Sequence, residues 1–545
     1  MPSQNQKHKL TYFRPGQLTF LGTHPNQAKP TYEQIEGLFS KCREVLKELG
    51  YDQAQLKRRS VVSFPATRTV DCYKSSLPAT KSPAFTGQDE FSLIFADITG
   101  VDDDPIRFFW LITTLDEKLL RWSIDEFTLK VISPNWLASG APPEGSGSGG
   151  PGGWPVAYRG ASERAPYQFI NLPDTVTKSR KGEGVDVVIL DTAPSPQDLT
   201  EAYNEWQGKH PLIRSLLRPN GPLRVTNNPN LDTQVQVRGH EYKMTDHGLF
   251  VAGIVHTIAP CAGIHLIEVL NPYGVGDLES ITSGLEQAVR LIQNNPDRSF
   301  VVNCSLVVTL PLAEQHCYTR LEEDEYCFVD LYLELDRELE RIILNKVGTL
   351  GRTPGDDSEW LVRQRSTLED PCNDIYDLNS RVIAAAGNDR KPGRRDREQK
   401  PGQEDRPQAR YPAALQNVQG VGALPRDSAS PGGRHRTASY SNRADKPERI
   451  GITTLGGEEG EGQGVLGLYL GEFPGGEANC TKWAWWAGTS FATPITSGVT
   501  AAVLSGLPRP RATQEAIDEL YRTRIIQEEP KGTVDKEDVL EMTQG

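Results

Sequence analysis

Short apolar segments alternate with helical patterns through the second half of the chain, and this alternation limits the possible folds most. The segments are apolar throughout, which is typical of strands that are buried on both faces of a sheet. They are Val185–Leu190 (VDVVIL), Ile264–Leu270 (IHLIEVL), Phe300–Leu306 (FVVNCSL) and Arg381–Ala386 (RVIAAA). Helical spacing lies between them, near 277–294 and 325–346. We therefore predict an α/β fold, in which helices cover both faces of a mostly parallel sheet.

A low-complexity tract separates this part of the chain from an N-terminal unit. Residues 139–157 are rich in Gly, Ser and Pro, a composition that cannot bury a core and behaves as a flexible linker. We predict an N-terminal unit over 1–138, a second unit over 158–525 and a polar tail over 526–545. The total of 545 residues agrees with this division, because one hydrophobic core rarely supports so long a chain.

The N-terminal unit is predicted to be a smaller α+β domain. Apolar residues from Tyr32 to Leu49 follow helical spacing, and Gly50 can end that helix. Three further apolar runs, Phe91–Ile98, Ile106–Ile112 and Phe127–Ile132, are typical of strands. No residues in this unit have the spacing of a catalytic site.

Charge and composition argue against several classes of protein. The chain has 59 Lys and Arg against 72 Asp and Glu, a formal net charge of −13, which argues against nucleic acid as a partner. No apolar run approaches the ~20 residues that cross a bilayer, and the first residues lack the apolar core of a secretory signal. The eight cysteines include no CxxC pair, so they indicate neither a zinc site nor a disulfide framework. We expect a cytoplasmic protein that binds neither nucleic acid nor membrane.

Three segments carry the residue types that acyl transfer by a serine requires. The reaction needs a hydroxyl nucleophile, a base that takes its proton and a carboxylate that orients the base. Asp191 lies in VVILDTAPS, His247 in DHGLFVAGI, and Ser490 in AGTSFATPITSGVTAAVL. The chain order Asp, His, Ser is that of subtilisin. The histidines close to His247 in sequence, and therefore its rivals as the base, are His240, His256 and His265.

These segments resemble the three signature blocks of the subtilisin-like serine proteases, the subtilases. GTSFATP matches the serine block at every fixed position, His247-Gly248 matches the histidine block, and Asp191-Thr192 matches the aspartate block. The resemblance covers about residues 180–510. It implies a subtilisin-like three-layer αβα fold and a serine endopeptidase that cleaves polypeptides through an acyl-enzyme intermediate.

The resemblance also implies the role of each catalytic residue. Ser490 attacks the peptide carbonyl, and His247 takes its proton and returns it to the leaving amine. Asp191 orients the imidazole. VIAAAGN (382–388) resembles the strand and turn that carry the oxyanion-hole asparagine of the family, so Asn388 takes that role. Pro494 is expected in the first turn of the helix that begins near Ser490, where its missing N–H costs little.

Substrate-binding residues are implied by the same resemblance. They are Gly274, Gly276, Ser305, Leu306, Ala385, Gly387, Asp389 and Trp486. Asp389 is interpreted either as a charge that favours a basic residue before the cut bond or as a solvated turn residue. Trp486 either walls the leaving-group side of the cleft or belongs to a core cluster. Val307 and Val308 stand where the family has Gly-Gly and are expected to narrow the primary pocket.

Three insertions are expected around the cleft, over 309–380, 389–410 and 456–480. The highly charged loop 389–410 is predicted to gate substrate access or to be clipped itself. No cofactor is expected to be required, and no metal site is predicted. Calcium is common in the family, but the sequence contains no convincing Asp-rich ligand loop.

Two roles are open for the N-terminal unit. Its place before a linker suits an inhibitory propeptide whose tail plugs the cleft, with self-cleavage between about 134 and 157, so that the chain is a zymogen. The alternative is a retained regulatory or partner-binding domain. For the chain as a whole, the alternative to a serine endopeptidase is a catalytically latent regulatory or partner-binding protein on a subtilase scaffold.

Overall fold

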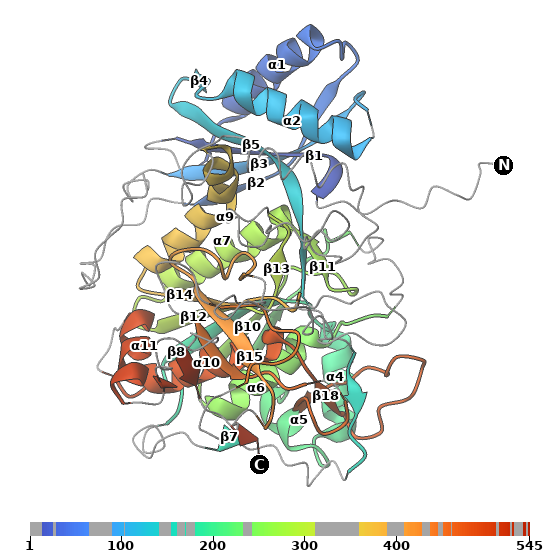
Figure 1. Cartoon of the computed structure of the whole chain (residues 1–545), viewed down its shortest axis with the longest axis vertical. Coiled ribbons are helices and arrows are strands. Elements are labelled where there is room, and N and C mark those ends of the chain that lie inside the picture. Colours follow the sequence, from blue (N-terminus) through green and yellow to red (C-terminus); the bar gives the residue numbers. More distant parts are fainter. Residues whose placement is uncertain are drawn as a thin grey trace, which may run out of the picture.

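The structure is a computed structural model of the whole chain (Figure 1). It describes residues 13–24, 29–64, 90–102, 104–140, 154–160, 169–170, 180–232, 242–310, 359–389, 408–427, 436–444, 451–458, 460–507, 512–523, 526–527, 538–540 and 543–544. The helix predicted near 325–346 and most of the loop at 389–410 lie outside these residues. Within the described ranges, no helix combines the length and apolar character that a membrane span would need.

The N-terminal unit is an antiparallel sheet with two helices on its outer face (Figure 1). Its strands lie in the order β5–β1–β3–β2. Its elements are β1 (Phe13–Thr23), α1 (Tyr32–Glu48), β2 (Gln55–Phe64), β3 (Phe91–Thr99), α2 (Pro105–Leu119), β4 (Ser123–Ile124) and β5 (Phe127–Ser139). Helix α1 begins at a capping box, in which Thr31 and Gln34 exchange side-chain hydrogen bonds with each other's backbone N–H.

One strand predicted in this unit is wrong, because Ile106–Ile112 lies in helix α2. The start of α2 explains the difference. Asp104 accepts a hydrogen bond from the Arg107 N–H at 2.9 Å, and Pro105 occupies the first turn. The residues Phe108, Phe109, Leu111 and Ile112 are buried, whereas Trp110 between them is 45 % exposed. The apolar face of the helix is broad enough to resemble a continuous strand over seven residues.

The second unit is a three-layer α/β fold, as predicted. Its sheet has nine strands in the order β19–β20–β16–β15–β14–β12–β8–β10–β9, which are parallel except for β19 at one edge. The strands are β8 (Val185–Asp191), β9 (Leu223–Thr226), β10 (Gly263–Glu268), β12 (Ser299–Cys304), β14 (Arg381–Ala385), β15 (Gln419–Leu424), β16 (Ile452–Leu455), β19 (Ile526–Gln527) and β20 (Asp538–Leu540).

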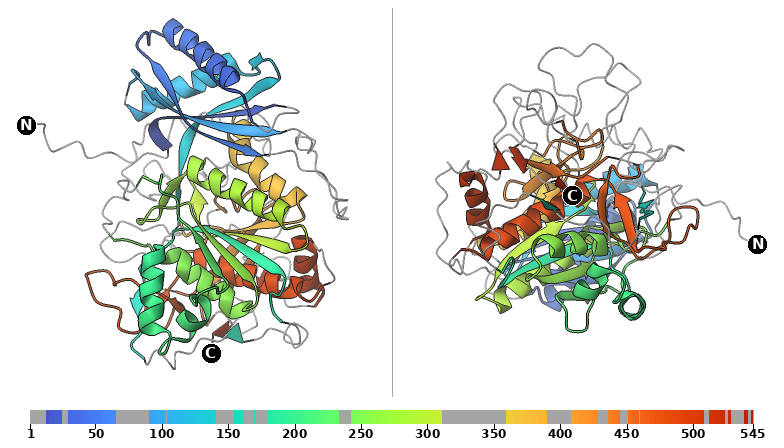
Figure 2. Two further views of the ribbon diagram at one scale, coloured as in Figure 1. Left: turned by 180° about the vertical axis from the view of Figure 1, so that it is seen from behind. Right: turned by 90° about the horizontal axis from the view of Figure 1, so that it is seen from below.

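Helices cover both faces of this sheet (Figure 2). The helices are α4 (Pro196–Trp206), α5 (Pro211–Leu216), α6 (His247–Ile258), α7 (Leu278–Asn294), α9 (Glu359–Asp377), α10 (Thr489–Leu504) and α11 (Thr513–Arg522). Helices α7 and α9 share a core with Val188 and Leu190 of β8, whereas α6, α10 and α11 share a core with Val187 and Ile189. The strand is therefore buried on both faces, which explains why its residues are apolar throughout.

The segment predicted as a polar tail from residue 526 contributes strands to the sheet instead. In β20, Asp538 and Val539 lie opposite Ile452 and Thr453 of β16, and β19 pairs antiparallel with β20. Val539 and Leu540 are buried. Two or three apolar residues in a polar context give almost no periodic signal, so the pairing with β16 determines this strand.

Strand β5 belongs to both units of the molecule. Most of its length pairs with β1, and its last three residues pair with β11 (Val275–Asp277) of the second unit. Ser139 and Ala138 also lie opposite β13 (Val307–Val308). Figure 1 shows the strand running from the N-terminal sheet down to β11 and β13. Ser139, the first residue of the predicted linker, is therefore part of a strand.

Other short strands complete the second unit. They are β6 (Val156–Ala157), β7 (Phe169–Ile170), β17 (Val465–Leu468), β18 (Trp483–Trp486) and β21 (Thr543–Gln544). β6 pairs with β18, so the end of the predicted linker also has a defined place.

Candidate active site

Asp191 and His247 meet at the carboxyl edge of the sheet. Asp191 is the last residue of β8, and His247 is the first residue of α6. His247 Nδ1 lies 2.7 Å from Asp191 Oδ1, and both side chains are fully buried. A buried carboxylate in this position fixes the orientation of the imidazole.

Thr192 joins the strand of the aspartate to the helix of the histidine. Its N–H donates to Asp191 Oδ1 at 2.7 Å, and its hydroxyl accepts from the Gly248 N–H at 3.1 Å and donates to the Met244 carbonyl at 3.0 Å. A Cβ on Gly248 would lie only 2.1 Å from the Thr192 carbonyl oxygen. Glycine after the histidine is therefore what allows α6 to approach the end of β8.

Ser490 lies in the first turn of α10, where the helix dipole favours developing negative charge. Pro494 lies one turn further along, so its expected place in the first turn is wrong. It has no N–H to donate to the Ser490 carbonyl four residues earlier. The Ser305 hydroxyl replaces that donor at 2.8 Å. Ser305, one of the predicted substrate-binding residues, thus supports the peptide of the candidate nucleophile.

Aromatic side chains surround His247. The ring centroids of Trp486 and Phe491 each lie 5.2 Å from the imidazole, and Trp486 meets it edge-on at 86°. Trp486 is 1 % exposed and belongs to the core of the second unit. Of its two predicted roles, the core cluster describes its surroundings in this structure.

Asp246, the residue before His247, anchors a loop of the second unit. Its carboxylate accepts hydrogen bonds from the N–H groups of Leu470 at 2.9 Å and Gly471 at 2.6 Å. Burial raises the pKa of this carboxyl to about 6, and the two N–H donors oppose the rise. Sequence reasoning missed this contact, because the partners are backbone groups more than 200 positions away.

The end of β5 lies against the candidate nucleophile. The Gly140 N–H donates to the Gly274 carbonyl at 3.0 Å, and the Ser490 hydroxyl donates to the Gly140 carbonyl at 2.8 Å. Gly276 pairs with Ala138. Among the described residues, His247 Nε2 has no hydrogen-bond partner. Residues 137–140 of the chain itself therefore extend from β11 to the candidate nucleophile, Ser490.

Asn388, the residue predicted to donate to the oxyanion, lies in the turn after β14. Its Oδ1 accepts from the N–H and the hydroxyl of Thr489 at 2.9 and 2.8 Å. The same hydroxyl accepts from the Gly387 N–H at 3.2 Å. Because the amide oxygen is occupied, the NH₂ group of Asn388 is the end that remains available to a carbonyl oxygen. Ala385 is the last residue of β14, and Leu306 is fully buried just before β13.

Asp389 does not present a free charge. Its carboxylate accepts from Arg410 Nε at 2.7 Å and from Asn442 Nδ2 at 2.6 Å. The Asp389 and Arg410 side chains are 5 % and 4 % exposed. Neither a solvated turn residue nor a free acid describes this position, and no sequence motif pointed to Arg410.

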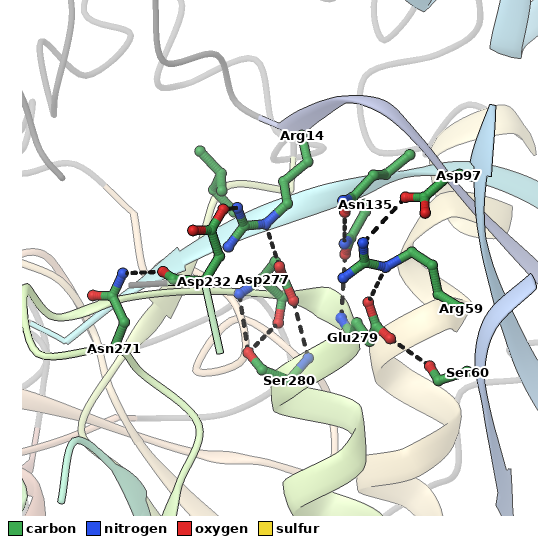
Figure 3. Close-up of polar contacts among 12 residues, drawn as sticks. Arg14, Arg59, Ser60, Asp97, Asn135, Asp232, Asn271, Asp277, Glu279 and Ser280 are labelled. Atoms are coloured by element: carbon green, nitrogen blue, oxygen red, sulfur yellow. Dashed lines mark hydrogen bonds and ion pairs between the residues drawn. The ribbon is translucent and has the colours of Figure 1, made fainter. Parts of the chain in front are cut away.

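Ion pairs hold the N-terminal unit on the start of α7 (Figure 3). Arg14 contacts Asp277, the residue that caps α7, and lies 3.1 Å from Asp232. Arg59 Nε lies 2.9 Å from the Glu279 carboxylate. The apolar core is also continuous from the N-terminal sheet into the α7 and α9 layer. The two units thus form an extensive contact beside the place where β5 enters the second unit.

The rival histidines lie in other environments. His256 contacts the Ser215 hydroxyl at 3.0 Å, and burial lowers its pKa to about 4. His265 lies 3.5 Å from Asp186. His240 is outside the described residues. In the ranges that the structure describes, no three His, Cys, Asp or Glu side chains gather as a metal site.

Comparisons with known proteins identify a family for most of the second unit. The family model described as Subtilase family matches residues 182–539, which include all four predicted catalytic residues. The comparison with curated proteins gave no match. Similar solved structures include a lanthipeptide protease (19 % identity over 67 % of this chain and 87 % of that chain, TM-score 0.39). A mutant of the protease domain of PatA (21 %, 66 % and 94 %, TM-score 0.37) and the prenylagaramide maturation protease PagA (20 %, 67 % and 91 %, TM-score 0.36) are also similar.

Proposed function

Because the chain belongs to the subtilase family, we propose that it is a serine endopeptidase with Asp191, His247 and Ser490 as its catalytic triad. Ser490 Oγ attacks the carbonyl carbon of a peptide, and His247 Nε2 takes the hydroxyl proton and gives it to the leaving amine. Water then cleaves the acyl-enzyme ester by the same steps in reverse. The observation that carries the proposal is the buried 2.7 Å contact between Asp191 and His247, beside a serine hydroxyl that touches a peptide carbonyl.

The oxyanion of each tetrahedral intermediate is assigned to two donors, the Asn388 NH₂ and the Ser490 N–H. Thr489 supports this role, because it binds the amide oxygen of Asn388 and so directs the NH₂ group away from itself. A preorganised donor of this kind lowers a barrier by ~3–4 kcal/mol.

The N-terminal unit is proposed to be an intramolecular inhibitor. Residues 137–139 pair with β11, and residues 138 and 139 also pair with β13. A polypeptide substrate would need the same backbone groups of β11 and β13 that the end of β5 occupies, so the substrate and β5 must compete. Gly140 also accepts the hydrogen bond of the Ser490 hydroxyl. For catalysis the same hydroxyl must instead donate to His247, the proposed base.

Self-processing is proposed to cut the chain directly after this strand. The carbonyl that contacts Ser490 belongs to the Gly140–Ala141 bond. The next two bonds are Ala141–Pro142 and Pro142–Pro143, whose nitrogens carry no hydrogen. We therefore expect Gly140–Ala141 to be the cut bond. If the N-terminal unit stays attached, it is a retained regulator, which is the alternative role.

Intact-mass measurement after incubation with a fluorophosphonate tests the whole proposal. The wild type should gain one adduct and lose the mass of residues 1–140, whereas Ser490→Ala should do neither. Ser497→Ala is the matched control, because Ser497 lies in the same helix and bonds Asn303 instead. Absence of an adduct on the wild type, even after limited proteolysis of the N-terminal unit, would favour a latent binding protein on a subtilase scaffold.

A further inference from the structure

We propose that Arg410 and Asn442 are positioning residues for the oxyanion turn, residues 386–389, and that the Arg410–Asp389 pair makes the site select an uncharged residue before the cut bond. This inference rests on the proposed function, because it concerns the same site. It reassigns Asp389 from a charge that faces the substrate to a support for the turn.

Backbone hydrogen bonds fasten the turn to two distant segments. The Arg410 N–H donates to the Ala386 carbonyl at 2.8 Å, and the Asn442 N–H donates to the Gly387 carbonyl at 3.0 Å. The Asp389 N–H donates to Asn442 Oδ1 at 2.8 Å. The peptides on both sides of the oxyanion asparagine are thus held from outside the turn.

Side chains close the same contact. Asp389 Oδ2 accepts from both Arg410 Nε and Asn442 Nδ2. Gly387 has a φ of +111°, and a Cβ there would lie 2.7 Å from Asn442 Nδ2 and 3.0 Å from Arg410 Cγ. Only glycine fits between these side chains, so both of them pack directly against the turn.

The opposite side of the turn is held by the helix of the nucleophile. Thr489 binds the Asn388 amide oxygen through its N–H and hydroxyl. Asn388 is therefore fixed between Thr489 on one side and the Arg410–Asn442 contact on the other. Stabilisation of an oxyanion requires donors that are already in place, within about 0.5 Å, before the charge develops.

The ion pair also determines which charge the substrate encounters. The carbonyl that Asn388 would bind belongs to the residue before the cut bond, so the side chain of that residue starts two bonds from the carbonyl carbon. Asp389 is the next residue after Asn388, and a free carboxylate there would attract Lys or Arg. Arg410 neutralises it in a nearly dry environment. Gly140, the residue that the chain itself places at Ser490, has no charge either.

Three variants of the full chain distinguish an effect on the oxyanion turn from a general loss of stability. Arg410→Met keeps most of the side-chain volume and removes the charge, Arg410→Lys keeps the charge, and Asp389→Asn with Arg410→Met removes both charges. Each is assayed on peptides that differ only in Lys, Ala or Glu before the cut bond. Thermal unfolding and fluorophosphonate labelling of Ser490 are measured on the same samples.

We expect Arg410→Met to lower kcat on the Ala peptide about tenfold and to raise the Lys-to-Ala ratio of kcat/KM at least tenfold. Arg410→Lys should keep the wild-type ratio, and the double variant should return to it, because no unpaired carboxylate remains. An unchanged ratio in a folded, labelled Arg410→Met protein would overturn the inference alone. A wild type that neither labels nor cleaves would overturn the proposed function and this inference together.

Discussion

The second unit and the N-terminal unit contribute to the proposed active site in different ways. The second unit supplies polar side chains from strand ends and helix starts that lie far apart in sequence. The N-terminal unit supplies backbone, through Leu137–Ser139 and Gly140. Side chains of chemical importance can be recognised by residue type, whereas a strand that occupies a cleft uses N–H and C=O groups that every residue has. The first role can therefore be predicted from a sequence, and the second needs the fold.

The largest expected effect tests the side-chain half of this comparison. Asn388→Ala should lower kcat by about 10²–10³-fold and leave KM almost unchanged, because the lost donor acts on the transition state. Steady-state kinetics on a peptide substrate measures it, and Asn417→Ala provides a control outside the site, since Asn417 bonds Asn373. An equal loss in both variants would remove the special role of Asn388.

A buried acid of the second unit should give a pH effect that does not involve the N-terminal unit. The pKa of Asp246 is raised to about 6 in the fold, so the native state binds this proton more tightly than the unfolded state. The contribution of Asp246 to the stability of the wild type should fall as pH rises from about 4 to about 6 and then level off. Asp246→Asn lacks this titrating group. The free energy of unfolding of the variant should therefore rise relative to that of the wild type, by up to about 3 kcal/mol over the same pH range. Urea unfolding at several pH values measures the difference, and parallel curves would refute it.

The backbone half of the comparison is tested at Gly140. A Cβ there would lie 2.8 Å from Leu270 Cδ1, so Gly140→Val should push the end of β5 away from the nucleophile. We expect fluorophosphonate to label Ser490 about tenfold faster, since about 1.4 kcal/mol of lost contact gives that factor. Gly208→Ala is the matched control, because a Cβ at Gly208 meets nothing within 4 Å. Unchanged labelling would mean that β5 does not control access.

The smallest effect concerns the ion pairs between the units. Arg14→Met with Arg59→Met should speed labelling a few-fold at low salt, because partly exposed pairs contribute about 0.5–1 kcal/mol each. The difference from the wild type should shrink in about 1 M salt, where charges are screened. Lys118→Met is the control, since Lys118 pairs with Glu48 inside the N-terminal unit. A salt-independent difference would point to packing rather than charge.

The same contrast explains what could be predicted. Strands β8, β12 and β14 were predictable because burial on both faces leaves a continuous apolar run. Helix α2 was predicted as a strand, because its broad apolar face hides the helical period. The extension of β5 past Ile132 contains Pro134 and no alternation of apolar and polar residues, so only pairing with β11 defines it. Arg410 was missed for a related reason: an ion pair between distant segments has no local pattern.

Because strand β5 is shared between the two units, its contact with the second unit responds to protein concentration in a particular way. While the chain is intact, the occupying segment stays at the nucleophile with an effective concentration that the total amount of protein does not alter. A single cut after Gly140 would make the same contact bimolecular, although the residues on both sides of it are the same as before. After the cut, the fraction of second units that still hold the cleaved segment would depend on the protein concentration. One hydrolysed bond thus turns a contact that dilution cannot weaken into one that dilution alone can open.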